Sequence, residues 1–194
     1  MNPLPIYKMQ INEEDESGVD YVSLVDQPAI ESNWMAFKEN KPFLFAANLD
    51  RRIITGALMI ANKPIYRNNP DMGEFMVVFD APTIEQIAQK FFKLNKVNNV
   101  NAMHEEVIPG VYMFESFIVD KQRGIMPPKG FENISNGSWF GSYKVENEEV
   151  WNNFIKTGEF KGFSVEGLFD MKPLKMRKID QYQEFCNWLD KLNG

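Results

Sequence analysis

The chain has 194 residues, a net charge of −6 and a hydrophobic content of 44%. These values are typical of one globular domain over residues 1–194. The acidic balance disfavours a nucleic-acid-binding protein, which normally needs a basic face. No apolar run is long enough to cross a bilayer, so no membrane partner is expected, and the single cysteine, Cys186, favours a reducing compartment.

Several strands are predicted in the first half of the chain. Residues 5–11 alternate apolar and polar side chains, as a half-buried strand does, and an acidic turn follows them. The runs at 52–61 and 75–79 are apolar and rich in β-branched residues, which favours strands buried on both faces. Between these two runs, the prolines and asparagines of residues 64–71 indicate a loop.

Two segments of the same half favour helices. Pro28 is suited to open a short helix that reaches Phe37. Farther along, residues 84–94 place apolar side chains at helical spacing, with Asp80 or Thr83 as the N-cap.

A turn at residues 108–110 introduces an apolar strand over residues 111–120. If the chain on both sides of this turn forms a hairpin, His104 faces a residue near Glu115, because strands pair symmetrically about their turn. An acid is unusual in so apolar a run. Glu115 therefore either points into solvent or orients His104.

The remaining elements are a loop, a strand and two helices. Residues 121–137, with their prolines, glycines and asparagines, predict a mobile loop. Residues 138–145 predict a strand, and residues 148–156 a short helix that ends at Gly158. Apolar residues at helical spacing over residues 178–192 predict an amphipathic C-terminal helix.

The stretch over residues 161–170 combines apolar residues, glycines and a single serine. As a strand it places Ser164, Glu166 and Leu168 on one face. A hydroxyl and a carboxyl side by side suit a chemical site better than a core. The glycines leave room for a backbone or a substrate to come close.

The histidine and cysteine counts narrow the chemistry further. The chain has one histidine, His104, and one cysteine. A hydrolase built on a serine–histidine pair would have to use His104 as its base. Multi-histidine and thiolate zinc sites are excluded, so neither a metal nor another cofactor is expected.

Residues 22–30, His104 in its polar loop, residues 114–120 and residues 162–167 occur in an order that matches a known family. With these segments the chain resembles the XkdF-like phage serine proteases, a branch of the prohead maturation proteases related to the herpesvirus assemblins. The resemblance covers nearly the whole chain.

The resemblance implies an α+β, mainly β domain, built as a compact closed β-barrel of about six strands flanked by helices. It also implies Ser164 as the nucleophile and His104 as the general base. Glu115 is favoured as the third member because of the hairpin, and Glu166 comes second because it shares the face of Ser164. The acids that stay open for this role are Glu115, Glu166, Asp120 and Asp170.

By the same resemblance, the chain is a serine endopeptidase that cleaves scaffold, capsid-protein extensions and itself. It would act inside the assembling phage prohead in the host cytoplasm, with residues 121–137 beside the substrate groove. Its partners would be scaffold and capsid proteins, and a homo-oligomer is compatible with this role. No nucleic acid is expected among the partners.

Two other classes of function stay open. The first is a non-catalytic head-assembly or scaffold-binding protein on the same fold. The second is a hydrolase of small esters or amides, which is disfavoured because Glu166 stands where a nucleophile elbow needs glycine.

Overall fold

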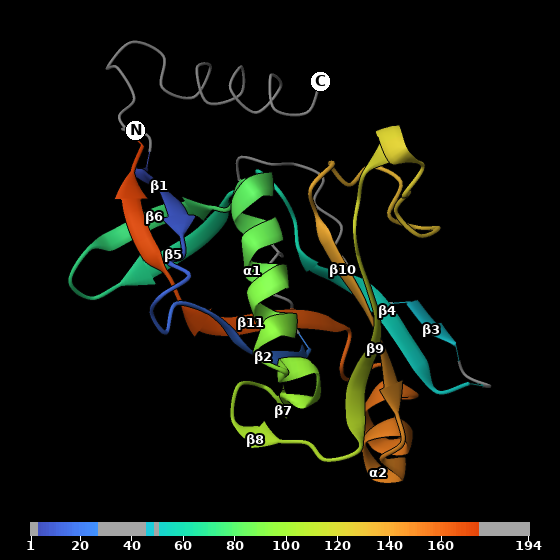
Figure 1. Cartoon of the computed structure of the whole chain (residues 1–194). Helices are drawn as coiled ribbons and strands as arrows, with labels where there is room; N and C mark the ends of the chain where they lie inside the picture. Colours follow the sequence, from blue (N-terminus) through green and yellow to red (C-terminus); the bar gives the residue numbers. More distant parts are fainter. Residues whose placement is uncertain (1–3, 27–45, 49–50, 175–194) are drawn as a thin grey trace.

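The computed structural model describes residues 4–26, 46–48 and 51–174, which form three four-stranded sheets around one longer helix (Figure 1). In spatial order, the first sheet contains β12 (Asp170–Pro173), β1 (Ile6–Gln10), β6 (Gly73–Val78) and β5 (Ile65–Asn69). The second contains β3 (Ala46–Asn48), β4 (Ile53–Met59), β10 (Trp139–Val145) and β9 (Val111–Ile118). The third contains β11 (Gly162–Leu168), β2 (Gly18–Val25), β7 (Val100–Ala102) and β8 (Glu106–Val107).

Two segments of the chain, β1 to β2 and β11 to β12, connect the first sheet with the third. β11 pairs antiparallel with β2, and β12 pairs antiparallel with β1. Phe169 lies between β11 and β12 and packs its ring edge against Phe79, at a centroid distance of 5.0 Å. The chain therefore changes sheets at Phe169, and the strand that carries Ser164 ends beside an aromatic cluster.

The mainly-β expectation agrees with the structure, but the closed barrel of about six strands is wrong. A barrel needs hydrogen-bonded neighbours around its full circumference. Within the described residues, β11 approaches β4 without pairing with it, so the third sheet stays open on that side. Edge strands β3 and β8 have 3 and 2 residues, too few to extend the pairing.

Helix α1 (Ala81–Lys93) lies at the centre of the molecule, between the sheet of β1 and the sheet of β10 (Figure 1). The Asp80 carboxylate accepts a hydrogen bond from the Thr83 backbone N–H at 3.1 Å, which confirms the predicted cap. The apolar face of α1 is buried, and Phe91 meets Trp139 edge-on at 5.4 Å. This burial fixes α1 against β10.

Shorter helical segments complete the described structure: η1 (Lys96–Asn98), η2 (Lys121–Arg123), α2 (Glu148–Val150) and the π-helical turn η3 (Trp151–Ile155). The last two confirm the helix predicted over residues 148–156. The predicted helices at 28–37 and 178–192 lie outside the described residues. Among the helices that are described, none combines the length and apolar character needed to cross a bilayer.

Two segments differ from the sequence-based expectation. Residues 64–71, predicted as a loop, contain β5, an edge strand whose exposed polar side chains hid its pairing with β6. Residues 121–137 have little regular structure, as predicted, but Phe131 and Ile134 are buried against Phe140 in a second apolar cluster. This loop is therefore anchored to the core at two points.

Gly167 offers a test of how tightly β11 is held against β2. The strand register shifts between Glu166 and Gly167, and a Cβ atom at Gly167 would lie 1.9 Å from the Gly18 carbonyl oxygen. Gly167→Ala is expected to lower the free energy of unfolding by about 3 kcal/mol, because backbone must move to relieve the overlap. Urea denaturation measures this loss.

Gly124→Ala is the matched control. Gly124 has a φ of 80° but no atom within 4 Å of its would-be Cβ, so only the left-handed backbone is penalised, at about 1–2 kcal/mol. Equal losses for the two variants would show that β11 and β2 do not approach this closely.

Candidate active site

His104 lies in the tight turn that joins β7 to β8. The Glu105 N–H donates to the Ala102 carbonyl oxygen at 2.9 Å and closes the turn. Inside it, Met103 and His104 have φ angles of 51° and 64°, values that residues other than glycine adopt uncommonly. Such backbone strain is concentrated at functional sites. The turn presents the imidazole beside β2 and β11.

Strand β11 supplies a hydroxyl and a carboxylate to the same place. Ser164 and Glu166 are two positions apart, so both side chains lie on one face of the strand. Ser164 is the register partner of Ser23 on β2 and is only 5% exposed. The side chain of Glu166 is 44% exposed. The pairing of β11 with β2 thus places Ser164 beside Ser23, whose hydroxyl contacts His104.

The imidazole of His104 is held at one nitrogen by two oxygen atoms. His104 Nδ1 lies 3.1 Å from Glu166 Oε2 and 2.9 Å from Ser23 Oγ. The Asn101 amide donates to the same Glu166 Oε2 at 3.1 Å, and Asn101 is itself buried. Asn101 therefore orients the same carboxylate oxygen that contacts the imidazole.

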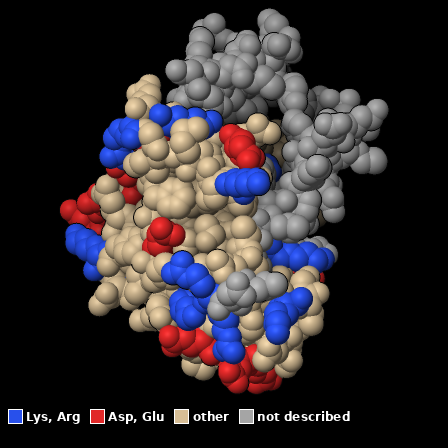
Figure 2. All heavy atoms as spheres, turned by 90° about the vertical axis from the view of Figure 1, so that its right-hand side faces the viewer, with Lys and Arg blue, Asp and Glu red and all other residues tan. Residues whose placement is uncertain are grey.

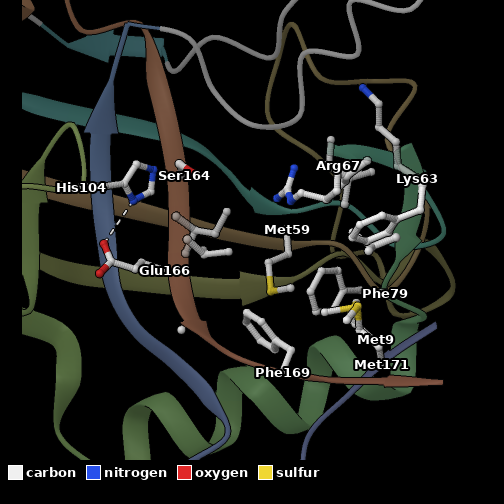
Figure 3. Close-up of a pocket in the computed structure, with 17 residues that line it drawn as sticks. Met9, Met59, Lys63, Arg67, Phe79, His104, Ser164, Glu166, Phe169 and Met171 are labelled. Carbon is white, nitrogen blue, oxygen red and sulfur yellow. Dashed lines mark hydrogen bonds and ion pairs between the residues drawn. The ribbon is translucent and has the colours of Figure 1, made fainter. Parts of the chain in front are cut away.

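This arrangement determines the tautomer of His104. An ionised carboxylate can only accept a hydrogen bond, so the contact with Glu166 places the proton on Nδ1. Ser23 Oγ then shares that N–H as a second acceptor, and Nε2 is left as the basic nitrogen. Figure 3 shows Ser164 on the side of the ring away from Glu166. Carboxylate, imidazole and hydroxyl therefore lie in the order that a serine nucleophile needs, but His104 and Ser164 are not hydrogen-bonded to each other in this structure, where the bonds of the ring go to Glu166 and Ser23.

The predicted hairpin that would bring Glu115 opposite His104 is wrong. β8 pairs with β7 rather than with β9, so the turn at His104 closes a different hairpin. Glu115 lies on β9 in the second sheet, where its carboxylate accepts from Ser142 Oγ at 2.6 Å. The contact with His104 that was expected from Glu115 is made by Glu166, the second choice. Asp120 instead contacts Arg123 at 2.6 Å.

The three grouped residues form part of the wall of a cavity of about 360 Å³. His104, Ser164 and Glu166 line one side, and the remaining wall is mostly apolar (Figure 3). Lys63 and Arg67 supply positive charge to the wall, and desolvation there lowers the pKa of Lys63 to about 8. No residue of the loop over 121–137 lines this cavity, so the expectation that this loop borders it is not supported.

A second groove carries no comparable set of groups. Its lining within residues 4–26, 46–48 and 51–174 consists of Arg51, Ile53, Tyr112, Phe114 and Lys144, with no serine, histidine or carboxylate among them. Lys144 Nζ donates to the Arg51 carbonyl oxygen at 2.5 Å. Figure 2 shows the side of the molecule that carries β3, where Lys and Arg side chains gather in the lower half with acidic ones beside them. Among the described residues, no cluster of three or more His, Cys, Asp or Glu could hold a metal ion.

The sequence alone does not predict a role for two residues of the site, Ser23 and Asn101. Ser23 is a lone hydroxyl inside the buried run from Val22 to Val25, and that burial was the available signal. Asn101 stands in a polar segment that reads as loop, although its side chain is buried and bonded to Glu166. Pairing between distant strands brings both to His104, and local pattern does not predict such pairing.

A serine, a histidine and a carboxylate gathered on one cavity wall are the groups that serine hydrolases use. A family model described as "Putative phage serine protease XkdF" matches residues 41–172, so the chain belongs to this family of phage serine proteases. Comparisons with curated proteins and with solved structures give no match. The matched range contains His104, Ser164 and Glu166 but begins after Ser23. The relation to the assemblins stays a prediction.

Proposed function

We propose that the chain is a serine endopeptidase of phage head maturation, with scaffold protein, capsid-protein extensions and itself as substrates. It would act inside the assembling prohead in the host cytoplasm. Membership of the phage serine protease family supports the reaction class. The observation that carries the proposal is the position of His104, with Glu166 at Nδ1 and Ser164 on the opposite side of the ring.

In the proposed mechanism, His104 Nε2 takes the proton of Ser164 Oγ while that oxygen attacks the scissile carbonyl carbon. Glu166 holds the ring in the required tautomer and stabilises the imidazolium that forms. The imidazolium then returns the proton to the leaving amine, and the C–N bond breaks to give an acyl-enzyme. A water molecule activated by His104 attacks the ester, which releases the acid and restores Ser164.

The site suits an extended peptide better than a folded domain. β11 pairs with β2 on one side and is approached by β4 on the other, so an extended peptide would lie along the cavity face of β11 that carries Ser164 and Glu166. A segment aligned with β11 would bring its backbone carbonyls past Ser164. Flexible extensions of scaffold and capsid proteins can adopt this conformation, whereas the interior of a folded domain cannot.

Co-expression tests the proposal directly. The full chain is produced together with the scaffold and capsid proteins of the same phage, and the products are analysed by intact-mass spectrometry. With the wild-type chain we expect truncated scaffold or capsid protein, and with Ser164→Ala we expect full-length protein only.

Unchanged processing with Ser164→Ala contradicts the proposal. Binding of scaffold without any truncation by the wild-type chain would indicate a non-catalytic assembly protein on the same fold. Labelling of Ser164 by a fluorophosphonate without peptide turnover would indicate a hydrolase of small esters or amides.

A further inference from the structure

We propose that the cavity beside Ser164 is a specificity pocket for a large apolar side chain next to the scissile bond. We further propose that Arg67 binds an acidic side chain of the same substrate. This inference deepens the proposed function and depends on it only for the cleavage step. It assigns a substrate class to the site, namely peptides in which a methionine, leucine or phenylalanine has an acidic neighbour.

The wall of the cavity is made of flexible and aromatic apolar side chains. They come from β1, β4, β6 and β12, from the residue that follows β6 and from the residue between β11 and β12, and they include Met9, Met59, Phe75, Phe79, Phe169 and Met171 (Figure 3). Methionine adapts its shape to several partners, so such a wall accepts more than one large apolar group. Small side chains would leave most of this surface uncovered.

The size of the cavity agrees with one large side chain and part of its backbone. A closed apolar cavity of about 150 Å³ already holds a benzene molecule. The present cavity has about 360 Å³, so a phenyl ring or a methionine side chain fits with room left over. Alanine or valine would fill a small part of it. A difference of a few methylene groups in an apolar pocket gives selectivities of about 10- to 200-fold.

The other residues that line the same wall indicate which molecule the cavity binds. Ser164, His104 and Glu166 face the cavity together with its apolar residues. A peptide whose carbonyl carbon lies at Ser164 Oγ therefore has its neighbouring side chain at the cavity entrance. An apolar pocket continuous with a nucleophile is the usual arrangement for a specificity subsite.

Arg67 adds a charge requirement to the apolar one. Arg67 is an exposed residue that also lines the cavity, and its guanidinium is directed toward the Ser164 side in Figure 3. Its Nη1 donates to the Tyr66 carbonyl oxygen at 2.9 Å, and none of the ion pairs among the described residues involves Arg67. The fork of guanidinium donors is suited to a carboxylate. Glu166, the acid on the opposite wall, is already bonded to His104 and Asn101.

The test uses the full chain and a mixed peptide library, with cleavage sites read by mass spectrometry. We expect methionine, leucine or phenylalanine at one position flanking the cut to exceed alanine about tenfold or more. Aspartate or glutamate should be enriched nearby. Met171→Trp should reduce cleavage at large apolar residues, because Met171 lines the cavity and is partly exposed, so the larger ring can occupy the space.

Matched controls separate these effects from general damage. Leu168→Trp makes a similar change at an exposed position that does not line the cavity, and should leave the preference unchanged. Arg67→Glu should convert the preference for acidic neighbours into one for basic neighbours, whereas Arg51→Glu, at the other groove, should not. Cleavage without apolar preference, or identical preferences for Met171→Trp and Leu168→Trp, overturns the pocket. An unchanged acidic preference in Arg67→Glu overturns the role of Arg67.

A binding measurement keeps the inference distinct from the proposed function. Fluorescent Gly-Ser peptides with a central Ala, Val, Met or Phe beside Glu are titrated against Ser164→Ala by anisotropy. Tighter binding of the Met and Phe peptides, weakened by Met171→Trp, supports the pocket even if the wild-type chain cuts nothing, in which case only the proposed function fails. Equal binding of all four peptides, or none, overturns the pocket.

Discussion

Ser164→Ala is expected to lower kcat for a peptide substrate by about a millionfold, while Ser23→Ala lowers it by about tenfold at most. The comparison matters because Ser23 Oγ lies 2.9 Å from His104 Nδ1 and is also a hydroxyl of the site. Nδ1 already carries the proton that contacts Glu166, so it cannot take another from Ser23. Ser164 is placed on the basic side of the ring (Figure 3).

The rate of peptide hydrolysis by purified full-length chain measures both variants. The loss expected for Ser23→Ala reflects one hydrogen bond that positions the ring, worth about 1 kcal/mol. A fluorophosphonate provides a second readout, because it should label Ser164 in the wild type and in Ser23→Ala at the same residue. Labelling of Ser23, or a larger loss in Ser23→Ala than in Ser164→Ala, contradicts the assignment of the nucleophile.

Elements with a strong local period could be predicted from the sequence. Helix α1 has an apolar face at helical spacing and a cap at Asp80, and both signals lie within one segment. β4 and β10 are mostly apolar and are buried over most of their length, because they pair with each other in the middle of their sheet. Whether the sheets close into a barrel depends on pairing between strands that are far apart in the sequence. Nothing local in β11 shows that it approaches β4 without pairing.

The candidate site, like the fold, could be predicted only where the signal lies in a single residue count or a single segment. A single histidine limits the base to His104, and the family resemblance indicates Ser164. The choice of the carboxylate depended on which hairpin contains His104, and the turn at Met103–His104 has left-handed residues without glycine or asparagine to announce it. Turns of this kind are normally recognised by Asn-Gly or Asp-Gly. The placement of Glu166 follows from the alternation along β11, which the sequence does show.

Glu166→Gln is expected to lower kcat by about 10⁴-fold, and Glu115→Gln to leave it near the wild-type value. The reason is the tautomer rather than the shape of the side chain. A glutamine can turn its amide N–H₂ toward His104 Nδ1, which then accepts instead of donating. Ser23 Oγ, at 2.9 Å, can donate to the same nitrogen and reinforce that state. The proton of the neutral ring moves to Nε2, and no base faces Ser164.

Rates of peptide hydrolysis and of fluorophosphonate labelling should fall together in Glu166→Gln, because both need the activated hydroxyl. Glu115→Gln is the matched control, since Glu115 is also a strand glutamate bonded to a neighbouring side chain, Ser142. Asn101→Ala should give a smaller loss in the same direction, because Asn101 orients Glu166 without contacting the ring. If Glu115→Gln proves the more damaging change, His104 is oriented from β9 during the reaction, and the hydrogen bond from Glu166 is a resting contact that catalysis does not use.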